Sequence, residues 1–99
     1  MAITKKFLKS IPICKVTFTV PAEDAKKVSV LGSFNNWNEK KALRLKKLKN
    51  GNFKGTLDLE KDNSYEFRYL VDGTYVNDEQ ADAYAWNDFA GAENSVLNV

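Results

Sequence analysis

Residues 64–73 read Ser-Tyr-Glu-Phe-Arg-Tyr-Leu-Val-Asp-Gly, and they decide the fold of this chain. Every second position from 65 to 71 is apolar or aromatic, which places those side chains on one face of a β-strand. They are Tyr65, Phe67, Tyr69 and Val71, with Glu66, Arg68 and Leu70 on the other face. Asp72 and Gly73 both tolerate a positive φ, so they predict a tight hairpin. The stretch therefore predicts a core strand that ends in a hairpin.

Short strands of the same kind are predicted on both sides of this stretch. Residues 14–20 alternate in the same way and direct Cys14, Val16, Phe18 and Val20 towards a core. Further strands are expected over residues 28–32, 43–48, 53–59, 74–77 and 95–99. Many short strands with turn signals at about 8–12-residue spacing indicate an all-β, antiparallel β-sandwich of about seven short strands.

Length and composition bound the class of protein. The 99 residues predict one domain over residues 1–99, with residues 1–12 as an N-terminal arm. A net charge of +2 creates no strong demand for a polyanion or a membrane surface. The sequence shows no apolar run near the roughly 20 residues of a membrane span and no signal-peptide pattern. We therefore expect a cytoplasmic protein with no membrane partner.

The residue types present also narrow the chemistry. The chain has no histidine and a single cysteine, which excludes a zinc site of the usual ligands and removes the usual base of a nucleophilic triad. Glycoside hydrolysis needs two carboxylates across a cleft, and a small sandwich offers no obvious cleft for them. The acidic residues between positions 78 and 93 match no calcium-loop spacing. We expect no metal site, no cofactor and no enzyme activity.

A polar loop after the 28–32 strand is the first candidate for binding. It carries Trp37 among the asparagines Asn35, Asn36 and Asn38. Amide side chains both donate and accept hydrogen bonds, and an indole offers a flat apolar face, so the pattern suits a sugar ring. The alternative is that Trp37 packs on the end of the sandwich and the asparagines shape a turn. The loop alone leaves both interpretations open.

A basic stretch of the sequence raises a second candidate partner, a single-stranded nucleic acid. Lysine and arginine residues crowd positions 40–54, near Trp37 and Phe53, and basic side chains beside aromatic ones hold single-stranded nucleic acids. The same residues also suit the solvent-facing side of a hairpin, where lysine protects a sheet edge. We favour the second interpretation because opposite charges nearly balance over the chain. Nucleic acid is therefore not the expected partner.

Three motifs together resemble the glycogen-binding carbohydrate-binding modules. They are Gly-Ser-Phe-Asn-Asn-Trp at residues 32–37, the strand and turn at residues 65–73, and Gly-Ala-Glu-Asn-Ser-Val at residues 91–96. Such modules occur at the N-terminus of isoamylases and glycogen branching enzymes, and in the beta subunit of AMP-activated protein kinase. The resemblance runs from about residue 16 to residue 99. It implies an early-set, immunoglobulin-like fold and non-catalytic binding of an α-glucan such as glycogen, starch or a maltooligosaccharide.

The resemblance also implies the binding residues. Trp37 falls on a sugar-stacking position, and Tyr75 falls on the second stacking position, where the family has tryptophan. Arg68 falls on a basic position that is lysine in the kinase module. Asn94 falls on the asparagine that bonds sugar hydroxyls.

The sequence departs from the kinase module near its C-terminal end. Ala90 and Ala92 stand where that module has leucine and threonine. The segment 78–94, which we expect to be a loop, carries Tyr84, Trp86 and Phe89. Trp86 therefore either replaces the lost sugar contacts or pins the loop to the sandwich. The alternative function is a stand-alone structural or docking module that has lost sugar binding and partners a glycogen-metabolising enzyme through residues 78–89.

Overall fold

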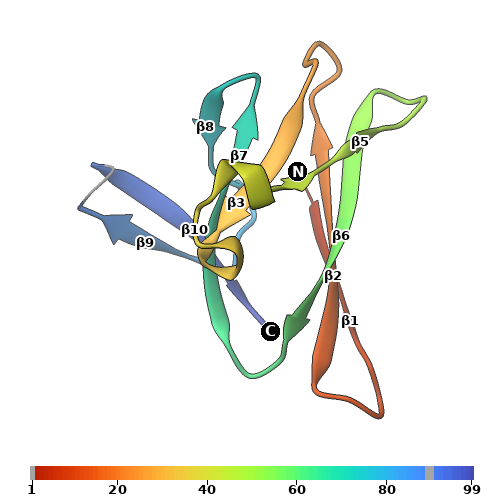
Figure 1. The fold of residues 1–99 in the computed structure, drawn as a ribbon, viewed down its shortest axis with the longest axis vertical. Helices are drawn as coiled ribbons and strands as arrows, with labels where there is room; N and C mark the ends of the chain where they lie inside the picture. Colours follow the sequence, from red (N-terminus) through yellow and green to blue (C-terminus); the bar gives the residue numbers. More distant parts are fainter. Residues whose placement is uncertain (1, 89–90) are drawn as a thin grey trace.

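Two antiparallel β-sheets face each other in the computed structural model, which describes residues 2–88 and 91–99 (Figure 1). The first sheet has the strand order β1-β2-β6-β5, and the second has the order β4-β3-β7-β10-β9, with β8 paired to β7. The strands are β1 (Ala2–Phe7), β2 (Ile13–Pro21), β3 (Val28–Gly32), β4 (Leu43–Arg44), β5 (Lys46–Lys47), β6 (Asn52–Glu60), β7 (Ser64–Val71), β8 (Thr74–Val76), β9 (Ala83–Asn87) and β10 (Ala92–Asn98). Two 3-10 turns, η1 (Ser33–Asn35) and η2 (Glu39–Lys41), lie between β3 and β4. The predicted all-β, immunoglobulin-like sandwich is confirmed, with ten strands among the described residues where about seven were expected.

The core lies between the alternating faces that the sequence predicted. Phe18 of β2 makes edge-to-face contacts with Phe67 and Tyr69 of β7, at centroid distances of 5.5 and 6.1 Å. The other residues predicted to face the core from residues 14–20 are also buried. Edge-to-face aromatic pairs add to the stabilisation that burial itself provides. The two central strands are therefore joined by their aromatic side chains.

The hairpin predicted at Asp72 and Gly73 forms, and a second glycine turn joins β5 to β6. Asp72 has a φ of 47° and Gly73 a φ of 88°, and they join β7 to β8. Gly51 has a φ of 89° in the connection between β5 and β6. Both positions need the left-handed backbone that glycine and asparagine or aspartate tolerate.

The expected N-terminal arm is instead a strand. Residues 2–7 form β1, which pairs with β2 along its whole length. Ile3 packs against the core, whereas Phe7 is exposed. The sequence hid this strand because β1 lies at the edge of its sheet, where only one apolar residue needs to face inward.

The stretch 43–48 does not form one strand, because it changes sheets. β4 pairs with β3 in the second sheet, and β5 pairs with β6 in the first. Leu45 lies at the crossing point and is buried, and its N–H donates to the carbonyl oxygen of Val28 at 2.9 Å. One buried leucine thus carries the chain from one sheet to the other.

The expected loop 78–94 is mostly a hairpin of β9 and β10, and the last strand begins at Ala92 rather than Ser95. This hairpin extends away from the rest of the sandwich (Figure 1). Asp78, which precedes it, is fully buried and accepts a hydrogen bond of 2.7 Å from the hydroxyl of Tyr69. Burial and this carboxylate together raise the pKa of Tyr69 far above its usual value. The hairpin therefore starts from a fixed point inside the core.

Candidate functional site

The outer face of the second sheet carries most of the residues that the sequence analysis singled out. Positions 66, 68 and 70 of β7 point away from the core, because positions 67 and 69 point into it. Leu31 of β3 pairs with Arg68, and Tyr75 of β8 pairs with Leu70. Strand pairing thus brings β3, β7 and β8 into one surface around Arg68.

Arg68 lies between two aromatic rings on this face. Its guanidinium carbon is 4.6 Å from the centre of the Tyr75 ring and 5.7 Å from the centre of the Trp37 ring. A guanidinium over an aromatic face is attracted by the ring quadrupole, by about 0.5–1 kcal/mol at an exposed site. The structure therefore brings Trp37, Arg68 and Tyr75 together, and we call these three residues the aromatic platform.

The η1 loop sets the position of Trp37. The side chain of Asn35 accepts a hydrogen bond from the N–H of Gly32 at 3.0 Å and donates one to the carbonyl of Val30 at 3.2 Å. Asn36 and Trp37 both have a φ of 56°, so two successive residues are left-handed. This backbone is uncommon for a tryptophan and is costly unless its surroundings enforce it. Asn35 shapes the turn, as the alternative interpretation held, while Trp37 is directed towards Arg68.

Asn94 of β10 lies beside the platform and is connected to it through Glu66. Its Nδ2 donates to Oε1 of Glu66 at 3.2 Å, and only 3% of its surface is exposed. Within the described residues, Oδ1 of Asn94 and Nε of Arg68 are buried atoms without a hydrogen-bond partner. A buried polar atom left in this state costs about 1–3 kcal/mol. One free acceptor and one free donor are therefore held at this site.

Trp86 does not join these residues. The register of β9 and β10 pairs Trp86 with Glu93 and Ala85 with Asn94. Because neighbouring positions alternate between faces, Trp86 and Asn94 lie on opposite faces of the hairpin. Trp86 is 64% exposed, so it does not pin the segment to the sandwich. Tyr84 has that role instead, since its hydroxyl donates to the carbonyl of Asp78 at 2.6 Å.

Two shallow cavities extend the outer face beyond Tyr75. Their volumes are about 220 and 210 Å³, and both are lined by Lys27, Ser29, Glu39 and Leu70. The first also reaches Tyr75, so the aromatic platform opens directly into it. These cavities could not be predicted from the sequence, because residues from distant positions of the chain line them.

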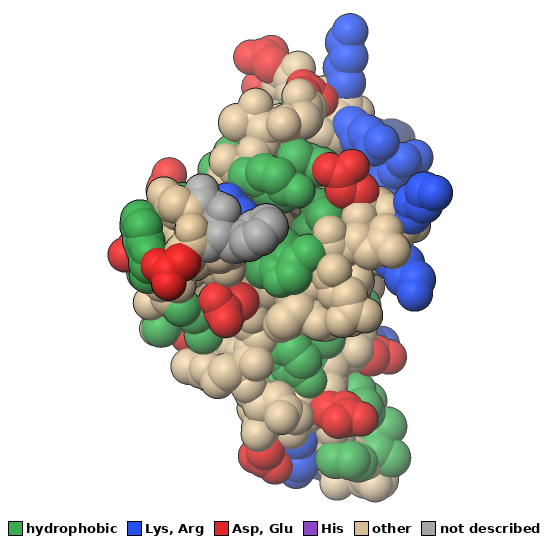
Figure 2. Space-filling model, turned by 60° about the vertical axis from the view of Figure 1, so that its left-hand side comes forward, with side chains coloured by type: hydrophobic (Ala, Val, Ile, Leu, Met, Phe, Trp, Pro, Cys, Tyr) green, Lys and Arg blue, Asp and Glu red, His purple; other side chains and the backbone are tan. Residues whose placement is uncertain are grey.

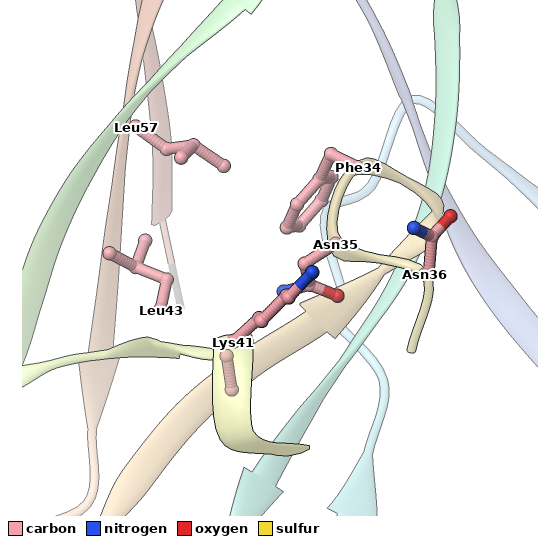
Figure 3. A pocket seen from close by; sticks show the side chains of 7 residues that line it. Phe34, Asn35, Asn36, Lys41, Leu43 and Leu57 are labelled. Atoms are coloured by element: carbon pink, nitrogen blue, oxygen red, sulfur yellow. The ribbon is translucent and has the colours of Figure 1, made fainter. Parts of the chain in front are cut away.

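A cavity of about 420 Å³ lies elsewhere, between the two sheets. The ring of Phe34 points across it towards Leu57 of β6, and Leu43 of β4 lies nearby (Figure 3). Its three large apolar side chains come from strands and turns of both sheets. We place the candidate site at the platform rather than here, because the unpaired donor belongs to Arg68 of the platform and the unpaired acceptor to Asn94 beside it.

The basic stretch is not brought onto the platform as one unit. Lys46, Lys47 and Lys54 belong to the first sheet, where Lys46 pairs with Lys54 across β5 and β6. Lys47 donates to the carbonyl of Glu23 at 2.8 Å and lies over the ring of Phe53. In Figure 2 most of the visible lysine and arginine side chains lie along one margin, and several apolar side chains lie towards the middle of the face.

In residues 2–88 and 91–99, no helix has the length and apolar character needed to cross a bilayer. The same part of the chain holds no group of three or more potential metal ligands.

Two aromatic rings and unpaired hydrogen-bonding groups on one face of a β-sandwich complement a ligand that has both apolar faces and hydroxyl groups. The family model described as the glycogen recognition site of AMP-activated protein kinase matches residues 15–99, and the chain belongs to this family. A comparison with curated proteins finds no match.

Proposed function

We propose that this protein is a non-catalytic module that binds α-glucans such as glycogen, starch or maltooligosaccharides through the aromatic platform and Asn94. The observation that carries the proposal is the contact of Arg68 with both rings, beside a free donor and a free acceptor. A sugar ring has apolar faces and a hydroxyl rim, and the rings and polar atoms complement these two features. Membership of a glycogen-recognition family supports the same ligand class.

The affinity should be modest. The platform is a surface rather than a deep pocket, so a few stacking contacts must offset the ordering of a flexible glucan. We expect dissociation constants on the order of micromolar to millimolar. We also propose a cytoplasmic location, which suits a chain whose single cysteine is buried and unpaired.

Trp37→Ala tests the site directly. The variant should abolish maltoheptaose binding, measured by NMR titration, and should lower the free energy of unfolding by less than about 1.5 kcal/mol. Phe67→Ala is the matched control for folding, because Phe67 is fully buried and its loss should cost about 3–5 kcal/mol. Wild-type protein that shows no shifts at millimolar maltoheptaose would refute the proposal.

A docking role is the second candidate, and the exposure of Trp86 favours it. A tryptophan that is 64% exposed is a good anchor for a protein interface. The proposed partner is a glycogen-metabolising enzyme. If this role is correct, retention of such a purified enzyme should require Trp86 and should not depend on Trp37 or on added glycogen.

A further inference from the structure

Glu66 connects two parts of the candidate site that come from distant segments of the chain. Its backbone N–H donates to the Oγ of Ser33 in η1, at 3.2 Å. Its side chain accepts from Asn94 on β10, also at 3.2 Å. Glu66 also lies on the outer face of β7, two positions before Arg68. One residue therefore touches the loop that carries Trp37 and the strand that carries Asn94.

The contact with Glu66 determines which end of the Asn94 amide is free. A carboxylate only accepts hydrogen bonds, so the group of Asn94 that faces it must be the Nδ2 amide, which donates. The Oδ1 atom is then directed away from Glu66, and it is the atom left without a partner among the described residues. Without a carboxylate at position 66, the amide is free to turn and to present its donor instead.

We infer that Glu66 is a positioning residue, which holds Asn94 so that its amide oxygen accepts a hydrogen bond from a sugar hydroxyl. The inference rests on the proposed glucan function and deepens it. In this arrangement, Arg68 supplies the hydrogen-bond donors of the site and Asn94 supplies an acceptor. Since Asn94 is almost fully buried, a sugar hydroxyl reaches it only when neighbouring side chains move aside.

The sharpest test exchanges the carboxylate and the amide between positions 66 and 94. Glu66→Ala should weaken maltoheptaose binding about threefold to tenfold, the effect of losing one positioning hydrogen bond. Asn94→Asp should also weaken it, because two carboxylates then face each other. The double variant Glu66→Gln with Asn94→Asp reverses the donor and the acceptor but leaves an oxygen of residue 94 free. Its affinity should return to within about twofold of wild type.

Glu93→Ala is the matched control, because it removes a carboxylate from the opposite face of β10, one residue from Asn94. It should leave the affinity unchanged. The NMR signals of the Asn94 side-chain amide, recorded without sugar, give a readout that a purely structural role would not move. They should shift in Glu66→Ala and stay in place in Glu93→Ala, and melting curves should show that each variant is folded.

The outcomes separate this inference from the proposed function. If the wild-type protein does not bind maltoheptaose, the proposed function is wrong, and so is the sugar contact of Asn94. If wild type binds and folded Glu66→Ala binds equally well, only the positioning role is wrong. A double variant that binds no better than Asn94→Asp alone also overturns the positioning role. Restored affinity in the double variant supports it.

Discussion

Gly32 is glycine because of crowding rather than because of its backbone angles. Its φ is −170°, an extended value that any residue adopts. A Cβ atom at this position would lie 2.4 Å from the carbonyl oxygen of Glu66 and 2.7 Å from the ring of Phe34. The backbone of β7 thus passes directly over Gly32. This close approach positions the start of the loop that carries Trp37.

Gly32→Ala should therefore destabilise the protein by about 1–3 kcal/mol, because a strand carbonyl cannot move aside as a side chain can. Gly55→Ala is the control, since the Cβ there would meet side chains rather than backbone, with the end of Leu45 at 2.5 Å and Leu43 at 3.6 Å. Urea denaturation of both variants measures the difference. An equal or larger loss in Gly55→Ala would contradict the explanation.

The sequence identified Trp37 but could not settle the roles of the asparagines around it. Whether an amide binds a ligand or its own backbone depends on which backbone groups lie within about 3 Å, and that follows from the turn. Glu66 was missed for a similar reason, because its partner Asn94 is 28 residues away. Its position beside Arg68 on the outer face was the available signal.

Strand β7 was predictable from the sequence, and β1 and β9 were not. The four inward side chains of β7 are all large, so the period of two stands out. β9 alternates alanine with Tyr84 and Trp86, but its aromatic side chains are largely exposed and no core explains them. Edge strands bury little, so their sequences carry little hydrophobic pattern. The change of sheet at Leu45 could not be predicted, because the alternating leucines on either side of it are typical of a single strand.

Variants of Trp86 and Tyr84 should show which aromatic residue of the β9–β10 hairpin stabilises the fold and whether either one binds sugar. Trp86→Ala should leave both the melting temperature and the maltoheptaose affinity unchanged, because Trp86 is exposed and lies on the face away from Asn94. Tyr84→Phe should cost about 0.5–1.5 kcal/mol, since it removes the hydrogen bond to the carbonyl of Asp78. Thermal melts and NMR titrations give both quantities. Loss of sugar affinity in Trp86→Ala would place it in the site after all.

One carboxylate joins the two sheets at their edge. Asp82 pairs with Lys5 of β1 in the first sheet and accepts from the backbone N–H of Asn98 of β10 at 2.8 Å. Burial alone would raise the pKa of Asp82, but the hydrogen bonds from Lys5 and Asn98 outweigh it and hold the pKa below its usual 3.8. The ionised form is therefore favoured by the folded state.

This predicts a defined acid sensitivity. Because the folded-state pKa is lowered, the contribution of Asp82 is complete above about pH 4 and is lost as the pH falls through that lowered value. Asp82→Asn should flatten the pH dependence of the unfolding free energy below about pH 4. At neutral pH it should cost less than about 1 kcal/mol, since the pair is partly exposed to solvent. Urea titrations at several pH values, with the exposed Asp24→Asn as control, measure this. An unchanged acid slope would show that the pair does not stabilise the fold.

The alternation of side chains along β10 places neighbouring residues on opposite faces of the hairpin. Asn94 and its neighbour Ala85 lie on one side of the hairpin, and Glu93 and Trp86 lie on the other. Substitutions at positions 86 and 93 therefore leave the residues that face Glu66 in place. Under the two proposed functions, the docking surface and the glucan site lie on opposite faces of one hairpin, so a substitution in one leaves the other unchanged.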